Sequence, residues 1–262
     1  MSDEQNLVSM RGIVKDFGTI EAVRGIDLEI GKNEIVGLLG DNGAGKSTLI
    51  KILTGVYPPT QGEIFWKGEK LVNYDVKKAR DLGIETVFQD RALCEQQTIW
   101  RNIFMGREIT NIFGFLNIKK MREETVSLMR NIMGFTSTAI EPDNIVGLMS
   151  GGERQGVAIS RALYFNSDLI ILDEPTTGLS LAETQKVLGF VKKIKNEGKS
   201  AIFISHNIYH VYPVVDRIVL VDRGKVEYNY NKNEITLDAL INSMYEVAGH
   251  ELPSEDGIGA GG

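Results

Sequence analysis

Gly40-Asp41-Asn42-Gly43-Ala44-Gly45-Lys46-Ser47-Thr48 decides the fold, because it has the spacing of a phosphate-binding loop. It directly follows the apolar run 35–39 and leads into the helix-compatible run 48–53, so the local order is strand, loop and helix. Its glycines permit positive φ and bring backbone N–H groups to a phosphate, and the start of the following helix adds positive potential. A plain glycine-rich turn is the alternative, but a chance match in a chain of this length is on the order of one in a hundred.

Two side chains of this loop have the chemistry of a nucleotide site. Lys46 is predicted to contact the β- and γ-phosphates, and Ser47 to offer its hydroxyl to Mg²⁺. We therefore expect the nine residues to bind a nucleoside triphosphate with Mg²⁺.

Size and composition indicate a protein with a large core. The chain has 262 residues, 42% of them hydrophobic, and its 29 Lys and Arg against 35 Asp and Glu give a net charge of −6, which argues against a nucleic-acid surface.

Cys94 is the only cysteine, which excludes an intramolecular disulfide and fits a reducing cytosol. The first residues lack a signal-peptide pattern and no apolar run approaches the roughly 20 residues of a membrane span, so we expect membrane contact to need a partner.

The strand pattern predicts two kinds of sheet. Strand-like runs near the N-terminus predict an antiparallel β-layer, and they occupy residues 7–17, 26–30 and 62–68. Buried-type runs interleaved with helical segments predict a mostly parallel sheet, and they occupy residues 35–39, 169–172, 201–204 and 218–221.

Between residues 90 and 149 the apolar spacing becomes helical, which predicts an inserted lobe. Its apolar positions are Met121, Val126, Leu128, Met129, Ile132 and Met133. The predicted class is therefore α/β, a P-loop sheet with an N-terminal antiparallel β-layer and an inserted helical subdomain. We expect one domain over residues 1–262: a nucleotide-binding core at about 7–90 and 160–230, a helical subdomain at 91–159, and a C-terminal helix and flexible tail at 231–262.

Asp173 and Glu174 follow the apolar run 169–172, which places both carboxylates at the carboxyl edge of the parallel sheet. Asp173 is predicted to hold the Mg²⁺ shell, and Glu174 to orient and polarise the attacking water as a general base. Two acidic residues opening a loop are common elsewhere, but beside a phosphate loop such strand-end carboxylates serve Mg²⁺. The pair therefore indicates hydrolysis of the triphosphate.

Ser150-Gly151-Gly152-Glu153 opens a helical stretch, and the start of a helix is an anion site. Ser150 and Glu153 also match a capping box, in which each side chain satisfies the other's backbone donor. The cap accounts for the serine and the glutamate but not for the two glycines. We therefore predict that these four residues contact the nucleotide.

The run Ser150-Gly151-Gly152-Glu153-Arg154-Gln155, followed by Leu172-Asp173-Glu174-Pro175-Thr176, resembles the nucleotide-binding subunit of ATP-binding-cassette transporters. The resemblance covers roughly residues 7–230, with four motifs in the family's order. It implies that Phe17 stacks on adenine, that Gln89 senses Mg²⁺ and the attacking water, and that His206 contacts the γ-phosphate.

The residues themselves leave alternatives open at these positions. Phe17 could belong to the core of the β-layer, and Gln89, after the strand-like run 84–88, could be an ordinary loop amide. His206 follows the buried-type run 201–205, so its imidazole is expected at the same sheet edge as Asp173. His210 lies four residues on, but no third ligand accompanies the two histidines, and we expect no zinc.

Two positions depart from the family pattern: Glu153 stands where Gln is usual, and Ser180 where Asp is common. Ser180 and Glu183 match a second capping box before the predicted helix 181–195. Lys192, Lys193 and Lys195 are most simply the solvated face of that helix. The apolar stretch Ile112–Leu116 is either core of the lobe or part of a groove that receives a permease helix.

The resemblance implies a Mg²⁺-dependent ATPase of a membrane transporter, in which two subunits close head to tail around two ATP molecules. One face of each site would supply the phosphate loop with Gln89, Asp173, Glu174 and His206, and the other Ser150, Gly151 and Gly152. Hydrolysis would remove the contacts that favour closure.

The implied partners are an integral-membrane permease and a second, identical or homologous cassette, with a solute-binding protein only indirectly; no nucleic acid is expected. The expected location is the cytoplasmic face of the cell membrane. Residues 92–108 and 203–213 are similar to ATPase subunits of bacterial monosaccharide importers, which suggests a sugar as the solute.

Two other functions remain open. A soluble cassette ATPase acting on a macromolecule would be favoured by a second cassette, a long coiled-coil insertion or a basic stripe, and the sequence has none of them. A nucleotide-binding regulatory module without hydrolysis is disfavoured by Glu174 and His206.

Overall fold

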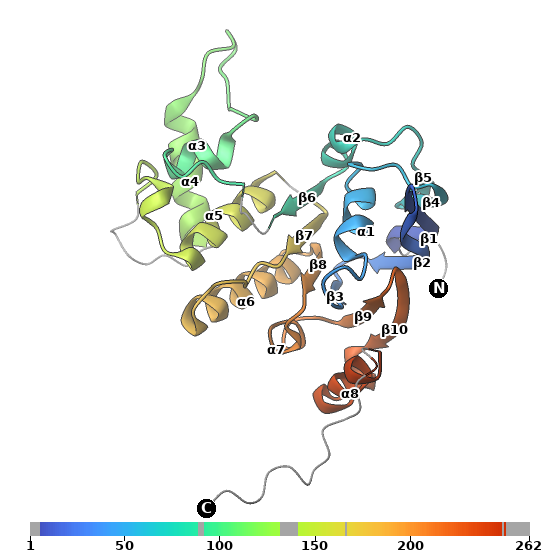
Figure 1. The fold of residues 1–262 in the computed structure, drawn as a ribbon. Coiled ribbons are helices and arrows are strands. Elements are labelled where there is room, and N and C mark those ends of the chain that lie inside the picture. The colour runs from blue at the N-terminus through green and yellow to red at the C-terminus, as the bar shows by residue number, and fades with distance from the viewer. Residues whose placement is uncertain (1–5, 89–91, 132–140, 166, 248, 250–262) are drawn as a thin grey trace, which may run out of the picture.

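The computed structural model describes residues 6–88, 92–131, 141–165, 167–247 and 249, which form two sheets and a helical lobe (Figure 1). The strands are β1 Asn6–Phe17, β2 Ile20–Gly31, β3 Ile35–Leu39, β4 Gln61–Trp66, β5 Glu69–Lys70, β6 Ile84–Val87, β7 Leu169–Asp173, β8 Ser200–Ser205, β9 Arg217–Asp222 and β10 Lys225–Asn231. The helices are α1 Lys46–Leu53, α2 Val76–Asp81, α3 Ile99–Phe104, α4 Ile118–Asn131, α5 Gly151–Tyr164, α6 Leu181–Asn196, α7 Ile208–Val211 and α8 Leu237–Val247. Short 3₁₀ turns occupy η2 Val146–Leu148 and η3 Lys232–Glu234.

The larger sheet has the strand order β10-β9-β3-β8-β7-β6. All of its neighbouring pairs are parallel except β9 and β10. The predicted mostly parallel sheet is therefore confirmed. Strand β10 was not predicted, because its residues alternate between exposed and half-buried and so leave no apolar run.

The smaller sheet has the order β2-β1-β4-β5 and is antiparallel, which confirms the predicted β-layer. Its second strand is longer than predicted and begins at Ile20. The strand expected over 62–68 ends instead at Trp66, because Lys67 and Gly68 take positive φ values of 50° and 85° and turn the chain into β5.

Strand β3 lies between two hydrophobic cores, and its side chains alternate between them as the strand period requires. Val36 and Leu38 join the core between the large sheet, α1 and the β-layer. Ile35 and Leu39 join the core that the sheet shares with α6, α7 and the lobe. The strand that leads into the phosphate loop is thus fixed from both faces.

The helical lobe consists of α3, α4 and the start of α5, beside the sheets in Figure 1. Met121, Leu128 and Met129 of α4 are buried as predicted, whereas Ile132 and Met133 lie outside the described residues. Asn102 is 1% exposed, and its side chain bonds to both backbone groups of Cys94, which ties the incoming chain to α3.

The apolar stretch Ile112–Leu116 does not belong to the core of the lobe, which removes one of its two interpretations. Ile112 and Phe113 are 93% and 77% exposed.

Of the three lysines assigned to a solvated face of α6, Lys192 is exposed, whereas Lys195 forms an ion pair with Asp216. None of the helices in the described part of the chain combines the length and apolarity that spanning a bilayer requires.

Gly37, in the middle of β3, allows α7 and the chain after it to approach the sheet closely. A Cβ at this position would lie 2.5 Å from Cγ1 of Val211 and 3.1 Å from Cγ1 of Val215. We expect Gly37→Ala to lower the free energy of unfolding by about 1–3 kcal/mol, because the added methyl overpacks a buried site. Gly189→Ala is the matched control, since open space surrounds Gly189 inside α6, and it should raise stability by up to about 1 kcal/mol. Urea denaturation measures both, and an unchanged midpoint for Gly37→Ala would contradict this packing.

Candidate functional site

The phosphate loop leaves the carboxyl end of β3 and ends at the first turn of α1, the predicted order of strand, loop and helix. Two of its glycines are required by close backbone approaches. A Cβ on Gly40 would lie 2.1 Å from the carbonyl oxygen of Val221, and one on Gly45 would lie 2.5 Å from that of Ala22. Both residues also have positive φ. The loop is therefore wedged between β9 and β2, and its conformation is set by the fold.

Lys46 is 7% exposed, and its ammonium group donates to the carbonyl oxygens of Gly40 at 2.6 Å and Asp41 at 2.9 Å. Burial lowers the pKa of Lys46, and the negative charges of Glu174, Asp41 and Asp173 act in the opposite direction. The strand-end carboxylates are thus close enough to the loop to raise the pKa of its lysine against the effect of burial. Ser47 is exposed beside it at the start of α1.

Asp173 ends β7, and burial together with the neighbouring Glu174 raises its pKa, while Lys46 and Lys51 lower it. Because the pKa of Asp173 is raised on balance, Lys46 and Lys51 do not fully offset the cost of burying its negative charge. A bound divalent cation would offset that cost. The Ser47 hydroxyl and the Asp173 carboxylate are also the oxygen donors that Mg²⁺ prefers. The residues present therefore fit a Mg²⁺ site.

Glu174 is surrounded by hydrogen-bond donors. Its Oε1 accepts from the backbone N of His206 at 3.0 Å and lies 2.8 Å from the Nδ1 of that residue. Its Oε2 accepts from the hydroxyls of Thr177 at 3.0 Å and Ser205 at 3.2 Å. Glu174 has a φ of 47°, an uncommon value for a non-glycine residue. The structure thus places Glu174 and His206 in contact at one sheet edge, and these bonds hold the carboxylate in place.

The imidazole of His206 is exposed, whereas His210 is engaged within the protein. The Nδ1 of His210 lies 2.9 Å from the Thr176 hydroxyl, and its Nε2 lies 3.3 Å from the Asn207 amide nitrogen. Burial and the neighbouring His206 lower the pKa of His210. Within the described residues no group of three or more His, Cys, Asp or Glu side chains is arranged to hold a metal ion.

Helix α5 begins with the predicted capping box. The Glu153 backbone N donates to the Ser150 hydroxyl at 3.3 Å, and the Ser150 N donates to the Glu153 carboxylate at 2.9 Å. The second predicted capping box, of Ser180 and Glu183, is present at the start of α6. The charge of Glu153 is therefore used in capping its own helix.

Glu183 has a contact that its sequence position did not predict. Its Oε1 accepts from the backbone N of Gly152 at 3.0 Å, while Oε2 accepts from the Ser180 backbone and hydroxyl. One carboxylate thus caps two helices, and it occupies an amide of the predicted anion site on α5. The hydrogen bond from Gly152 is the largest cause that lowers the pKa of Glu183 to about 2.

Phe17 is not part of the buried β-layer core. It ends β1, is 45% exposed, and packs edge to face on Tyr57 with ring centroids 5.3 Å apart. The Lys15 ammonium lies 5.2 Å from the Phe17 ring. Because Tyr57 and Lys15 contact the Phe17 ring while much of it stays exposed, the ring is available for stacking against a planar ligand. Gln89 lies outside the described residues, so its predicted role stays a prediction.

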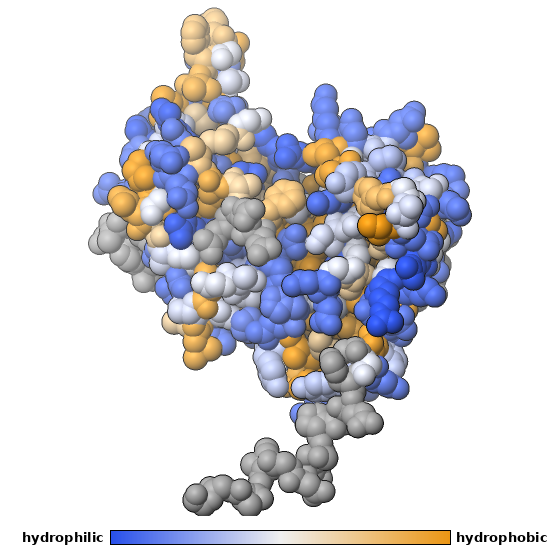
Figure 2. Space-filling model, viewed as in Figure 1, coloured by the Kyte–Doolittle hydropathy of each residue, from blue (hydrophilic) through white to orange (hydrophobic). Residues whose placement is uncertain are grey.

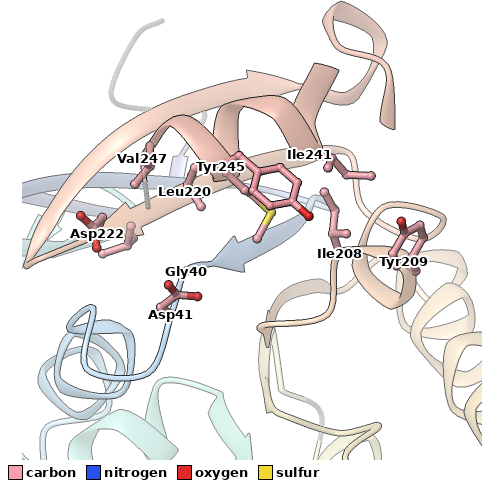
Figure 3. A pocket seen from close by; sticks show the side chains of 11 residues that line it. Gly40, Asp41, Ile208, Tyr209, Leu220, Asp222, Ile241, Tyr245 and Val247 are labelled. Atoms are coloured by element: carbon pink, nitrogen blue, oxygen red, sulfur yellow. The ribbon is translucent and has the colours of Figure 1, made fainter. Parts of the chain in front are cut away.

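A cavity of about 330 Å³ adjoins the start of the phosphate loop (Figure 3). Gly40 and Asp41 line it together with Ile208 and Tyr209 of α7 and residues of β9 and α8. Its α8 wall carries Ile241, Met244 and Tyr245. The cavity includes neither Lys46 nor the strand-end carboxylates, so it borders the predicted phosphate site without containing it.

Comparisons with known proteins agree with this geometry. The family model described as ABC transporter matches residues 23–177. The chain is 42% identical to the xylose/arabinose import ATP-binding protein XylG of Sulfolobus acidocaldarius over 95% of this chain and 96% of that protein. It is 37% identical to the ribose import ATP-binding protein RbsA of Clostridium tetani over 92% of this chain but only 47% of that protein. The chain thus spans nearly all of the first relative and about half the length of the second.

Among solved structures, the chain is similar to a dimeric post-hydrolysis ATP-binding cassette bound to ADP and Pi, with 26% identity and a TM-score of 0.72 over 86% of this chain and 98% of that one. The chain therefore belongs to the ABC transporter family, as an ATPase of that family. This confirms the resemblance that the phosphate loop, the Ser150 motif and the Asp173 motif indicated.

The depressed pKa of Glu183 predicts a specific pH dependence of stability. Because the folded value of about 2 lies below the ordinary 4.5, the carboxylate stabilises the fold above pH 4.5, and this contribution is lost as the pH falls toward 2. We expect Glu183→Gln to be less stable than the wild type at pH 6, with the difference shrinking at pH 3. Urea denaturation of both proteins at the two pH values measures this, and a pH-independent difference would rule out the charged contact.

Proposed function

We propose that the chain hydrolyses ATP to drive uptake of a monosaccharide, most simply a pentose, through a membrane permease. The proposal of ATP hydrolysis rests on the cluster of Lys46, Asp173 and Glu174. The two carboxylates lie close enough to Lys46 to raise its pKa, and Lys46 lowers the pKa of Asp173. The solute is inferred from relatives whose names specify xylose, arabinose and ribose import. The solute class rests on these names alone, because in such a transporter other chains would select the solute.

The proposed catalytic roles divide among the phosphate loop, the strand ends and Phe17. Lys46 and the loop amides of 40–48 bind the β- and γ-phosphates, and Phe17 stacks on the adenine. Ser47 and Asp173 provide oxygen ligands for Mg²⁺, which neutralises phosphate charge when bound. Glu174, held by its four donors, orients the attacking water and accepts its proton. His206, whose Nδ1 contacts Glu174, would contact the γ-phosphate through its exposed ring, and Gln89 would complete the water site.

The second half of each site comes from a second cassette, identical or homologous. Its Ser150, Gly151, Gly152 and Glu153 would approach the γ-phosphate across the interface. A similar solved cassette that is dimeric and bound to ADP and Pi supports the pairing of two cassettes. In this chain the Gly152 amide is already bound to Glu183. When the pair closes on ATP, the Gly152 amide would therefore exchange the Glu183 carboxylate for a phosphate. In the free subunit this amide already has a hydrogen-bond acceptor.

The remaining partners follow from the transporter assignment. The cassette pair binds an integral-membrane permease at the cytoplasmic face of the membrane, and a solute-binding protein acts only through that permease. Closure and reopening of the pair would move the permease between its two states.

The base assignment is tested by Glu174→Gln, which keeps the shape of the side chain and removes its basicity. We expect ATP turnover to fall by about 10²–10⁴-fold while ATP still binds, because general-base catalysis contributes on that order. The matched control is Glu197→Gln at the end of α6, which should keep wild-type turnover. Equal turnover in the Glu174→Gln variant and the wild type would remove the proposed base.

The transport assignment needs a different measurement. Co-purification of the chain with a permease, followed by uptake of labelled xylose, arabinose and ribose, should give ATP-dependent uptake that Glu174→Gln abolishes. Uptake of none of the three sugars by a complex that hydrolyses ATP would contradict the proposed solute class and leave the ATPase intact.

A further inference from the structure

A hairpin between α3 and α4 carries an unusual concentration of exposed apolar side chains. This apolar hairpin, residues 109–117, extends away from both sheets and forms the protruding tip in the space-filling view (Figures 1 and 2). Four of its large apolar side chains are exposed: Ile112 at 93%, Phe113 at 77%, Phe115 at 71% and Leu116 at 52%. Single exposed apolar residues need no explanation, but four on one projecting turn mark a contact surface.

Several backbone amides of the apolar hairpin are hydrogen-bonded within the hairpin itself. The Asn111 carboxamide oxygen accepts from the backbone N of Phe113 at 2.9 Å and of Phe115 at 3.0 Å. The Asn111 N donates to the Phe115 carbonyl at 2.8 Å, and the Gly114 N to the Asn111 carbonyl at 3.0 Å. These bonds satisfy four backbone amides of the turn, which lowers the free-energy cost of moving it out of water.

The root of the hairpin is attached firmly to the lobe. Thr110 and Leu116 form an antiparallel bridge, and the Asn117 N donates to the Ile109 carbonyl at 2.7 Å. Ile109 packs on the lobe core, and Met121, one turn into α4, is fully buried. The exposed side chains are therefore held outward by an ordered support rather than left on a free loop.

Cationic side chains follow the apolar tip. Residues 109–122 include Lys119, Lys120 and Arg122, and the carboxylates of Glu108, Glu123 and Glu124 flank this stretch. Arg122 is bound to Asp143, and the Lys119 ammonium, 88% exposed, lies 4.0 Å from Glu123. Lys119 and Lys120 lie in the first turn of α4, just after the apolar tip in the chain. Cationic side chains so close to an apolar turn can reach lipid headgroups while the apolar side chains enter the acyl boundary.

We propose that the apolar hairpin inserts into the interface of an anionic lipid bilayer, with Lys119 and Lys120 at the level of the headgroups. The tip is convex and internally hydrogen-bonded, which fits a deformable lipid surface better than the preformed pocket of a protein. The insertion would orient the lobe relative to the membrane independently of nucleotide, because the tip shares no residue with the phosphate site. It does not depend on the proposed sugar.

Vesicle sedimentation of the full chain tests this inference. The protein should pellet with phosphatidylcholine vesicles that contain phosphatidylglycerol, and less with phosphatidylcholine alone. The double variant Phe113→Ser, Phe115→Ser should lower the partition coefficient about tenfold or more, because binding scales with the apolar area inserted. Lys119→Gln with Lys120→Gln should remove the preference for anionic vesicles and its salt sensitivity.

The matched control is the double variant Val56→Ser, Val72→Ser, which removes two apolar side chains that are 44% and 57% exposed elsewhere on the surface. It should bind vesicles like the wild type, and thermal unfolding should show that all variants remain folded. Phe113→Trp supplies a second measurement, since both native tryptophans, Trp66 and Trp100, are buried. Its emission should shift to the blue on anionic vesicles and be quenched by brominated acyl chains.

Equal sedimentation of the wild type and the Phe113→Ser, Phe115→Ser variant would overturn the inference. So would a wild type that binds no vesicles while the tip variant loses co-purification with a membrane protein, because the hairpin would then be a protein contact. An unshifted tryptophan emission at position 113 on vesicles would contradict insertion directly.

Discussion

The buried ammonium of Lys46 is the interaction on which the rest of the site depends. A lysine that is 7% exposed loses hydration, and burial correspondingly lowers its pKa. The protein compensates with two backbone carbonyls at the start of the loop and with the carboxylates of Asp173 and Glu174 nearby. A triphosphate would supply stronger anionic partners in the same place, so the arrangement holds a cation ready for one.

The order of strands explains why these groups meet. Strand β3 lies beside β8, and β8 lies beside β7, all parallel. Their carboxyl ends therefore deliver the phosphate loop, His206 and the Asp173 and Glu174 pair to one edge of the sheet. The two strands that carry the carboxylates and the histidine are fully buried along most of their length, so the positions of these side chains are set by the packing of the core. Rigid strands hold the groups while loops are left free to contact partners.

Much of the fold and site could be predicted from the sequence, because the deciding signals are local. The phosphate loop, the strand-end carboxylates and both capping boxes each depend on residues within a few positions of one another. What the sequence did not reveal depends on distant contacts. The bond between Glu183 and Gly152 joins residues 31 positions apart, and the Ser205 hydroxyl, also 31 positions from Glu174, reaches that residue only in the folded chain. The sequence left the apolar stretch at Ile112 open between the core of the lobe and a surface contact, because apolar content alone does not show whether a segment is buried or exposed.

Nucleotide affinity of Lys46→Met tests the central claim most directly, because the substitution keeps most of the length of the side chain and removes the cation. Isothermal titration with ATP and Mg²⁺ should show a loss of about 10-fold to 100-fold relative to the wild type, the usual range for a hydrogen-bonded charge contact. Lys77→Met, at an exposed position of α2, should bind ATP like the wild type. Unchanged affinity in Lys46→Met would contradict the account, because the loop would then hold its lysine for a reason other than a phosphate.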